Sequence, residues 1–183
     1  MRRVLKSLLL MAAVAVVWAP VQARADGYFS PWGGVNFGSN IDNGRAAVGI
    51  NAGYMGAGIL GGELGFGYSP HFFGATSDFG ANSVIDLMAN LVVGIPVGGT
   101  HGAGLRPYVS AGAGLIRTQI DGATVGSVVN PAAKNNDFGF DFGGGVTGYV
   151  SQHFGLRGDI RYFKDKDESS FHYWRLSAGI VLR

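Results

Sequence analysis

The stretch from residue 137 to residue 148 alternates between two kinds of side chain, and it limits the possible folds more than any other part of the chain. Successive side chains of a β-strand point to opposite faces. One face of this stretch therefore carries Phe138, Phe140 and Phe142, whereas the other carries glycines and Asp141. An apolar outer face with a small, polar inner face is typical of a strand in a small transmembrane β-barrel. One strand is weak evidence, so the interpretation depends on whether the pattern recurs.

The same alternation recurs in segments of about ten residues, which is the length that a tilted transmembrane strand needs. We predict eight strands, at residues 27–37, 45–54, 59–68, 83–95, 105–116, 137–148, 154–163 and 171–183. After residue 25 no run of apolar residues is long enough for a spanning helix, which needs roughly 18 or more. The predicted fold is therefore all-β, an eight-stranded antiparallel up-and-down transmembrane β-barrel.

The first residues have the pattern of an export signal. Arg2, Arg3 and Lys6 precede an uncharged apolar run at residues 8–17, and the small-x-small pattern of a cleavage site ends at Ala25. The apolar run is too short for a membrane anchor, which needs about 20 residues. The sequence therefore predicts a signal peptide that is cleaved from the mature protein.

We predict two parts, a cleaved signal peptide at residues 1–25 and an outer-membrane β-barrel at residues 26–183. The signal peptide contains four of the 14 basic residues, so the mature charge is (14 − 4) − 12 = −2. This charge gives no reason to expect a nucleic-acid partner. Because the chain has no cysteine, it has neither a disulfide framework nor a thiolate metal site.

The connections between the predicted strands alternate between long and short. Residues 69–82 and 117–136 form the main predicted loops, and residues 55–58 and 149–153 form short turns. Outer-membrane barrels have long extracellular loops and short periplasmic turns, with both termini in the periplasm. The spacing of the strands thus predicts which end of the barrel faces outside.

Aromatic residues lie near both ends of the apolar face, where barrels carry aromatic girdles at the membrane interfaces. Ordinary sheet packing is the competing interpretation, because aromatic residues favour strands in general. The predicted girdle residues are Phe29, Tyr54 and Phe154 at the turn side, and Phe37, Tyr68, Phe138, Tyr162 and Trp174 at the loop side.

Charged residues recur on the opposite, inward face. An eight-stranded barrel has an interior barely wide enough for its side chains, so charges there must be paired or hydrated. They could form a selectivity or gating site, or they could form a polar plug. The narrow interior favours the plug. The predicted lumen charge network consists of Glu63, Asp86, Asp141, Arg157, Asp159, Arg161 and Arg175.

The positions of the turns predict partners within this network. If strands 137–148 and 154–163 pair about the turn 149–153, Asp141 lies opposite Arg161. The same reasoning about the last loop places Asp159 opposite Arg175. Opposite charges that face each other across a ladder are favourable. We expect Glu63 and Asp86 on the far wall, and Arg157 below the two pairs, to join them.

Three stretches resemble strands of known membrane proteins. They are Arg106-Pro-Tyr-Val-Ser-Ala-Gly-Ala-Gly-Leu, Glu63-Leu-Gly-Phe-Gly-Tyr-Ser-Pro and Leu176-Ser-Ala-Gly-Ile-Val-Leu. In these stretches the chain is similar to the OmpA/OmpX/OmpW-like superfamily of small eight-stranded outer-membrane barrels. The resemblance covers residues 26–183. It implies insertion into the outer membrane by the barrel-assembly machinery. We expect a monomer in a Gram-negative outer membrane, with outer-membrane lipids as its partners.

We find no pattern that predicts a catalytic, cofactor or metal site. The histidines at 71, 101, 153 and 172 are scattered among predicted loops and strand ends, and His172 and Ser177 fall on opposite faces of one strand. The sequence therefore favours a non-enzymatic outer-membrane protein with a structural or surface-interaction role and a lumen plugged by charged pairs. The alternatives are a narrow pore or a carrier for small hydrophobic molecules, an enzyme on lipid substrates, and a soluble lipocalin-like barrel with an apolar interior.

Overall fold

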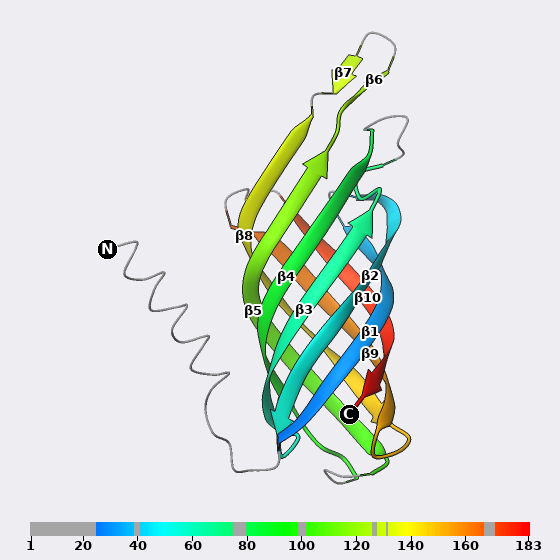
Figure 1. Ribbon diagram of the computed structural model, residues 1–183, viewed down its shortest axis with the longest axis vertical. Helices are drawn as coiled ribbons and strands as arrows, with labels where there is room; N and C mark the ends of the chain where they lie inside the picture. The colour runs from blue at the N-terminus through cyan, green and yellow to red at the C-terminus, as the bar shows by residue number, and fades with distance from the viewer. Residues whose placement is uncertain are drawn as a thin grey trace, which may run out of the picture.

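A closed antiparallel barrel of eight strands makes up most of the computed structural model, which confirms the predicted fold class (Figure 1). The structure describes residues 25–38, 41–74, 80–98, 102–125, 128–130, 132–166 and 171–183. The predicted signal peptide therefore lies outside the described residues except for its last residue, Ala25. Within these ranges, no helix is long and apolar enough to cross a membrane.

The barrel strands are hydrogen-bonded in the circular order β1-β10-β9-β8-β5-β4-β3-β2. Consecutive strands along the chain are neighbours, apart from a small separate hairpin, β6–β7, that lies between β5 and β8 in sequence. The bounds are β1 Ala25–Gly38, β2 Ile41–Gly56, β3 Leu60–Pro70, β4 Asn82–Gly94, β5 Gly104–Ile120, β6 Ala123–Val125, β7 Val128–Asn130, β8 Ala133–Tyr149, β9 Phe154–Asp165 and β10 His172–Leu182.

The long loop predicted at residues 117–136 is largely strand, so that prediction is wrong. The β5–β8 ladder continues from Arg117↔Asn136 to Ile120↔Ala133, and the β6–β7 hairpin follows it. Arg117, Asn135 and Asn136 are exposed, so this part of the ladder has no apolar face. A ladder needs only backbone hydrogen bonds to continue, whereas hydrophobic alternation ends where the strand leaves its apolar surroundings. The strand lengths predicted from the alternation are therefore too short for β5 and β8.

Large apolar side chains cover the outside of the barrel. Leu91, Phe142 and Leu156 are 55%, 54% and 56% exposed, whereas Met88 and Asp141, on the inward face, are each 2% exposed. Soluble proteins rarely expose contiguous apolar patches of this kind. The arrangement is the reverse of a lipocalin-like barrel, and it excludes that alternative.

The predicted girdle residues lie on this outer face. Phe29, Phe37, Tyr68, Phe138 and Phe154 are exposed. Tyr54, Tyr162 and Trp174 are half-buried. The rings of Tyr162 and Trp174 pack on each other with centroids 5.0 Å apart, so part of their burial comes from their mutual contact. Their location at the membrane interfaces stays a prediction.

We predict that Leu87→Arg destabilises the barrel far more than Val97→Arg. Both side chains are about half exposed, but Leu87 lies near the middle of β4 and Val97 lies beyond its end. A lipid-facing Arg costs about 2–4 kcal/mol at the bilayer midplane and about 0–1 kcal/mol near an interface. Urea unfolding of the two variants in lipid vesicles measures the difference. Equal losses in the free energy of unfolding would contradict the assigned membrane position.

Candidate functional site in the barrel lumen

Glu63 connects two opposite walls of the barrel. It lies on β3, and its carboxylate accepts hydrogen bonds from Arg157 and Arg161 on β9. The Arg161 Nη2–Glu63 Oε1 distance is 2.5 Å, and Tyr28 Oη donates to Glu63 Oε2 at 2.7 Å. In the circular order, β3 and β9 are four strands apart in either direction. The interaction therefore spans the full width of the lumen.

A second ion pair also crosses the lumen. Arg175 on β10 binds Asp86 on β4 through two parallel contacts, Nη1–Oδ1 at 3.1 Å and Nη2–Oδ2 at 2.5 Å. These strands are likewise four apart in the barrel order. Arg175 Nε donates to Asn36 Oδ1 at 2.8 Å, so every nitrogen of this guanidinium has an acceptor. A β-carbon on Gly67 would lie 2.4 Å from Asp86 Oδ2, so only glycine leaves room for this pair.

Asp159 joins the network from the β9 wall. Its Oδ2 accepts from Tyr108 Oη at 2.7 Å and Arg157 Nε at 3.1 Å, and its Oδ1 accepts from Ser177 Oγ at 2.8 Å. Arg161 Nε lies 3.6 Å from the same Oδ1. Several donors thus compensate the desolvation of this carboxylate, which is the condition for placing a charge inside a protein.

Asp141 has the weakest interactions among the acids of the network. Its only ion pair among the described residues is with Arg161, at 3.4 Å between Oδ2 and Nη1, and its Oδ1 has no hydrogen-bond partner there. All seven residues of the predicted lumen network are nevertheless buried, each at most 6% exposed. The structure therefore brings together all seven on the inward face.

The register differs from the one predicted, and it changes the pairing. Asp141 lies opposite Phe163, and Arg161 lies opposite Gly143, so the Asp141–Arg161 contact is diagonal. Asp159 lies opposite Ser177, so the predicted Asp159–Arg175 pair is wrong. Both ladders are shifted by two residues from the predicted centres. A shift of two residues keeps every side chain on the same face. The observed burial pattern therefore agrees with the predicted one, although the observed pairing partners differ.

Several members of the network were not singled out from the sequence. Tyr28, Tyr108 and Asn36 bind the charged groups directly. The alternation that placed the charged residues on the inward face also places Tyr108 and Ser177 there. These two residues could therefore have been identified from the sequence. The ion pairs between opposite walls could not be predicted from the sequence. The alternation shows which face a side chain is on, but not which side chains meet across the lumen.

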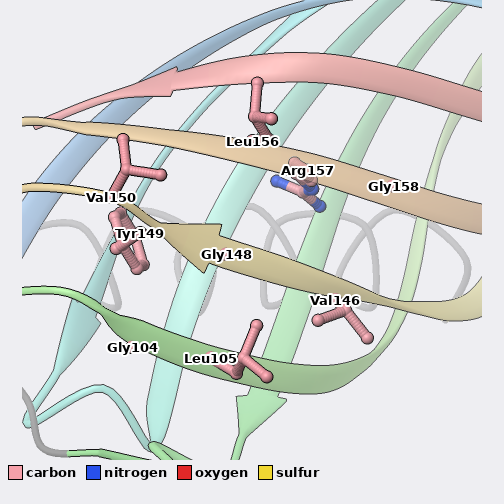
Figure 2. Close-up of a pocket in the computed structure, with 9 residues that line it drawn as sticks. All are labelled: Gly104, Leu105, Val146, Gly148, Tyr149, Val150, Leu156, Arg157 and Gly158. Atoms are coloured by element: carbon pink, nitrogen blue, oxygen red, sulfur yellow. The ribbon is translucent and has the colours of Figure 1, made fainter.

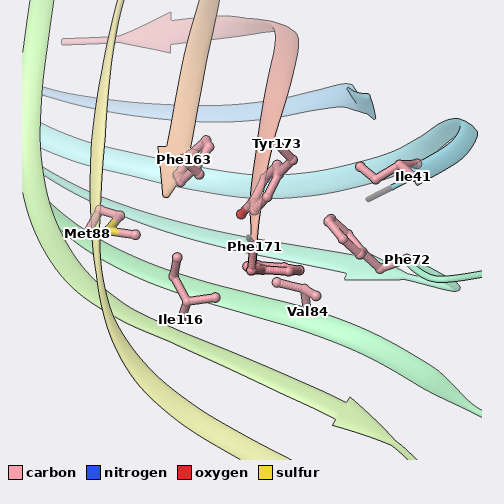
Figure 3. Packing of buried hydrophobic residues seen from close by; sticks show 8 residues of the cluster. All are labelled: Ile41, Phe72, Val84, Met88, Ile116, Phe163, Phe171 and Tyr173. Carbon is pink, nitrogen blue, oxygen red and sulfur yellow. The ribbon is translucent and has the colours of Figure 1, made fainter. Parts of the chain in front are cut away.

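An apolar layer fills the lumen at the loop end (Figure 3). Phe72, from the connection between β3 and β4, is fully buried, with its ring centroid 5.0 Å from that of Tyr173. Phe163 stacks on Tyr173 at 4.8 Å. The buried residues of the layer are Ile41, Phe72, Val84, Met88, Ile116, Phe163, Phe171 and Tyr173. This layer departs from the uniformly small and polar interior that the sequence suggested.

Asn82 fixes the connection that carries Phe72. Its Oδ1 accepts from the backbone N–H of Phe73 at 3.0 Å, and its Nδ2 donates to the carbonyls of Gly74 and Gly80 at 3.2 and 3.1 Å. A buried side chain that satisfies three backbone groups holds Phe73, Gly74 and Gly80 in place. Asn82 thereby helps to position the neighbouring Phe72 over the lumen.

An open hollow of about 560 Å³ lies on the outer wall rather than in the lumen (Figure 2). Leu105, Val146, Val150 and Leu156 surround it, and Gly148 provides its floor without a side chain. The hollow has few polar groups and faces the same side as the exposed apolar residues. It is thus mainly a feature of the lipid-facing surface, although Arg157 of the charged network is among the residues that line it.

The described part of the chain contains no group of three or more His, Cys, Asp or Glu side chains that could hold a metal ion. His172 packs on the outer ring of Tyr162 at 5.7 Å, whereas Ser177 binds Asp159 inside the lumen. These two residues therefore lie on opposite faces, as the sequence predicted. His101 lies outside the described residues.

The chain matches the family model of the outer membrane protein beta-barrel domain over residues 7–181, and it belongs to this family. The protein is accordingly an outer-membrane β-barrel, as the sequence predicted. A comparison with curated proteins finds no match.

Solved structures with a similar fold include small outer-membrane barrels. Neisserial surface protein A shares 18% identity at a TM-score of 0.64, over 86% of this chain and 97% of that one. The N-terminal barrel of Pseudomonas aeruginosa OprF shares 18% identity at 0.56, over 86% and 96%. The attachment invasion locus protein Ail of Yersinia pestis shares 14% identity at 0.53, over 86% and 98%. At these identities the comparison establishes the fold alone.

We predict that Asp86, and not Asp159, is energetically coupled to Arg175. Removing Asp86 leaves a buried guanidinium without its carboxylate, which costs roughly 3–5 kcal/mol. Asp86→Ala should therefore destabilise more than the double change with Arg175→Met. Double-mutant cycles from urea unfolding measure this coupling, with the Asp159/Arg175 cycle as the matched control. A larger coupling in the Asp159 cycle would support the register predicted from sequence instead.

We also predict that Glu63→Gln is more damaging than Asp141→Asn. Glu63 neutralises two arginines at close range, whereas Asp141 contacts one of them at 3.4 Å. Losing the Glu63 charge should cost on the order of 3–5 kcal/mol, as for other broken buried ion pairs. The free energy of unfolding of both variants, measured under one condition, tests the order. The reverse order would show that Asp141 is the main anion of the network.

Proposed function

We propose that the protein is a closed, non-enzymatic outer-membrane barrel whose role is structural or lies in contacts at the cell surface. The observation that carries the proposal is the pair of ion-pair bridges between opposite walls, Glu63 with Arg157 and Arg161, and Asp86 with Arg175. An eight-stranded barrel has an interior just wide enough for its own side chains. Bridges that span this interior leave no open path beside them for a solute.

Two layers in series support the closed lumen. The charged layer lies in the middle of the barrel, and the apolar layer around Phe72 lies at the loop end. Among the described residues, two cavities next to the network have volumes of about 10 Å³ each. A cavity of this size holds about one water molecule. A hydrated ion or a sugar would have to displace side chains of both layers.

The surface role is supported by the part of the barrel beyond the membrane. The β5–β8 ladder extends past the other strands, with the β6–β7 hairpin at its end (Figure 1). This is the long-loop end, which faces outside in outer-membrane barrels. Two proteins of similar fold have names that refer to the surface or to attachment. We propose that this extension, rather than the lumen, contacts partners of the cell.

The proposed state in the membrane is a monomer, inserted by the barrel-assembly machinery and surrounded by outer-membrane lipids. Closure of the eight-stranded sheet leaves no strand edge within the barrel that needs a second copy. The continuous apolar outer face matches lipid tails. Both features support a barrel that is stable by itself.

A carrier for small hydrophobic molecules is the second candidate, and the apolar layer is the observation that favours it. Phe72, Phe171 and Tyr173 present at the loop end the kind of surface that binds apolar ligands. However, these side chains pack on one another, and Arg175 lies against the rings of Phe163 and Tyr173. A ligand that displaced Phe72 would meet the charged layer next, so the closed barrel is the better-supported proposal.

Conductance across a planar bilayer tests the proposal. The refolded protein should show no steady ion current. Phe72→Ala, which opens only the apolar layer, should remain closed because the bridges of Glu63 and Asp86 are unchanged. Steady conductance of the unmodified protein would contradict the proposal and favour a narrow pore. Conductance of Phe72→Ala alone would show that the charged layer does not close the lumen.

A further inference from the structure

A cluster of positive charge lies on the outside of the barrel at its loop end, apart from the lumen network. Among the described residues, the exposed Lys and Arg side chains all belong to β5, β8 and the end of β9, which are neighbouring strands. We call them the basic patch, which consists of Arg117, Lys134, Lys164 and Lys166. On each strand the patch shares the outward side of the alternation with Leu115, Phe138 or Tyr162.

The strand register fixes the spacing of the basic patch. Arg117 lies opposite Asn136, so Lys134 is its diagonal neighbour on the next strand, at a Cα distance of about 7–8 Å. The backbone N–H of Lys166 donates to the carbonyl of Phe138 at 3.0 Å, which continues the β8–β9 ladder by one residue. Two strand spacings and two residues along the strand separate Arg117 from Lys166, or about 12 Å between their Cα atoms. The patch therefore consists of two pairs of cations, one on β5 and β8 and one on β9.

Negative charge on the same face does not balance the basic patch. None of its four side chains forms an ion pair with a described residue. Asp137 and Asp165 belong to the same strands but are buried on the inward face. Asp121, after the end of β5, is the exposed acid among the described residues here, while Asp167 and Glu168 follow β9 in the sequence outside them. Within the described part, four cations thus face one exposed carboxylate.

The basic patch begins where the apolar outer face ends. Lys164 is two residues beyond Tyr162 on the same face of β9, and Arg117 is two residues beyond Leu115 on β5. Tyr162 belongs to the predicted aromatic girdle, and such girdles lie at the level of the lipid headgroups. Basic side chains at this level attract anionic headgroups. The patch is thus placed to contact lipid at the membrane surface rather than a partner far above it.

The charge and the spacing of the patch select the headgroup. Lys and Arg form charge-assisted hydrogen bonds with phosphate, and these are stronger than hydrogen bonds between neutral groups. A headgroup with one phosphate and its own amine is neutral overall and reaches one pair of cations. A headgroup with two phosphates has the opposite charge to the patch and can place one phosphate against each pair.

We propose that the basic patch binds a glycolipid that carries two phosphates on its sugar headgroup, in the leaflet at the loop end. One phosphate contacts Arg117 and Lys134, and the other contacts Lys164 and Lys166. The inference rests on the proposed function, because the loop end must face outside, in the leaflet that contains such a lipid. It needs neither a closed nor an open lumen, since no residue of the patch belongs to the lumen network.

Native mass spectrometry of the refolded protein, released from detergent micelles, tests the headgroup without any variant. The probes are bisphosphorylated and monophosphorylated lipid A, which differ by one phosphate. The unmodified protein should retain one molecule of the bisphosphorylated lipid and bind it severalfold more tightly than the monophosphorylated one. Higher salt should weaken this binding, because it screens exposed charges. Equal binding of the two lipids, or binding of neither, would overturn the inference.

Two variants test the basic patch against a control with the same change in charge. Lys166→Gln and Arg117→Gln should each weaken the binding of bisphosphorylated lipid A about fivefold, as expected for the loss of one cation near an anionic surface. Gln152→Glu lowers the net charge equally at an exposed position in the β8–β9 turn, at the other end of the barrel, and should leave binding unchanged. An equal loss in all three variants would show attraction by net charge alone and would contradict a site at the patch.

A soluble polyanion is the competing partner for the same four cations, and dextran sulfate is the probe for it. We expect Lys166→Gln to lose more affinity for bisphosphorylated lipid A than for dextran sulfate. The reverse order would mean that the patch serves a partner outside the membrane, and the inference would be wrong. That failure would leave the proposed closed lumen standing, because bilayer conductance tests the lumen separately.

Discussion

The contact of Glu63 with Arg157 and Arg161 is the interaction on which the interior of this barrel depends. The outer face must be apolar because it meets lipid, so the charged residues of the strands are confined to the lumen. There each charge needs a partner, because desolvation without one is costly. The circular strand order places β3 opposite β9, and β4 opposite β10. Long arginine side chains can therefore reach carboxylates on the far wall.

Glycine makes this arrangement possible. A β-carbon on Gly67 would collide with Asp86 and Arg175, and one on Gly145 would lie 2.7 Å from Tyr108 Oη. Inward glycines thus provide the volume that the large charged and aromatic side chains occupy. The apolar layer around Phe72 then fills the loop end, where the network stops. The composition rich in glycine and aromatic residues is consistent with filling a narrow lumen completely.

The sequence was sufficient to predict the fold class and the face of each lumen charge, because alternation with period two is a local property. It was not sufficient to predict the partners. Asp159 was expected to pair with Arg175, but the ladders are shifted by two residues and Arg175 reaches across to Asp86. The end of β5 was also missed, because Arg117 and the residues after it continue the ladder without an apolar face. Contacts between distant strands leave no local pattern in the sequence. A ladder that continues outside the membrane leaves none either.

Hydrogen exchange of the arginine Nε–H groups, followed by NMR, tests the closed and paired lumen most directly. In this structure Arg157 Nε binds Tyr108 and Asp159, and Arg175 Nε binds Asn36, each in a buried position. These two protons should exchange with water far more slowly than that of the exposed Arg117. Exchange of all three at the same rate would show a hydrated, unpaired lumen and would contradict the account.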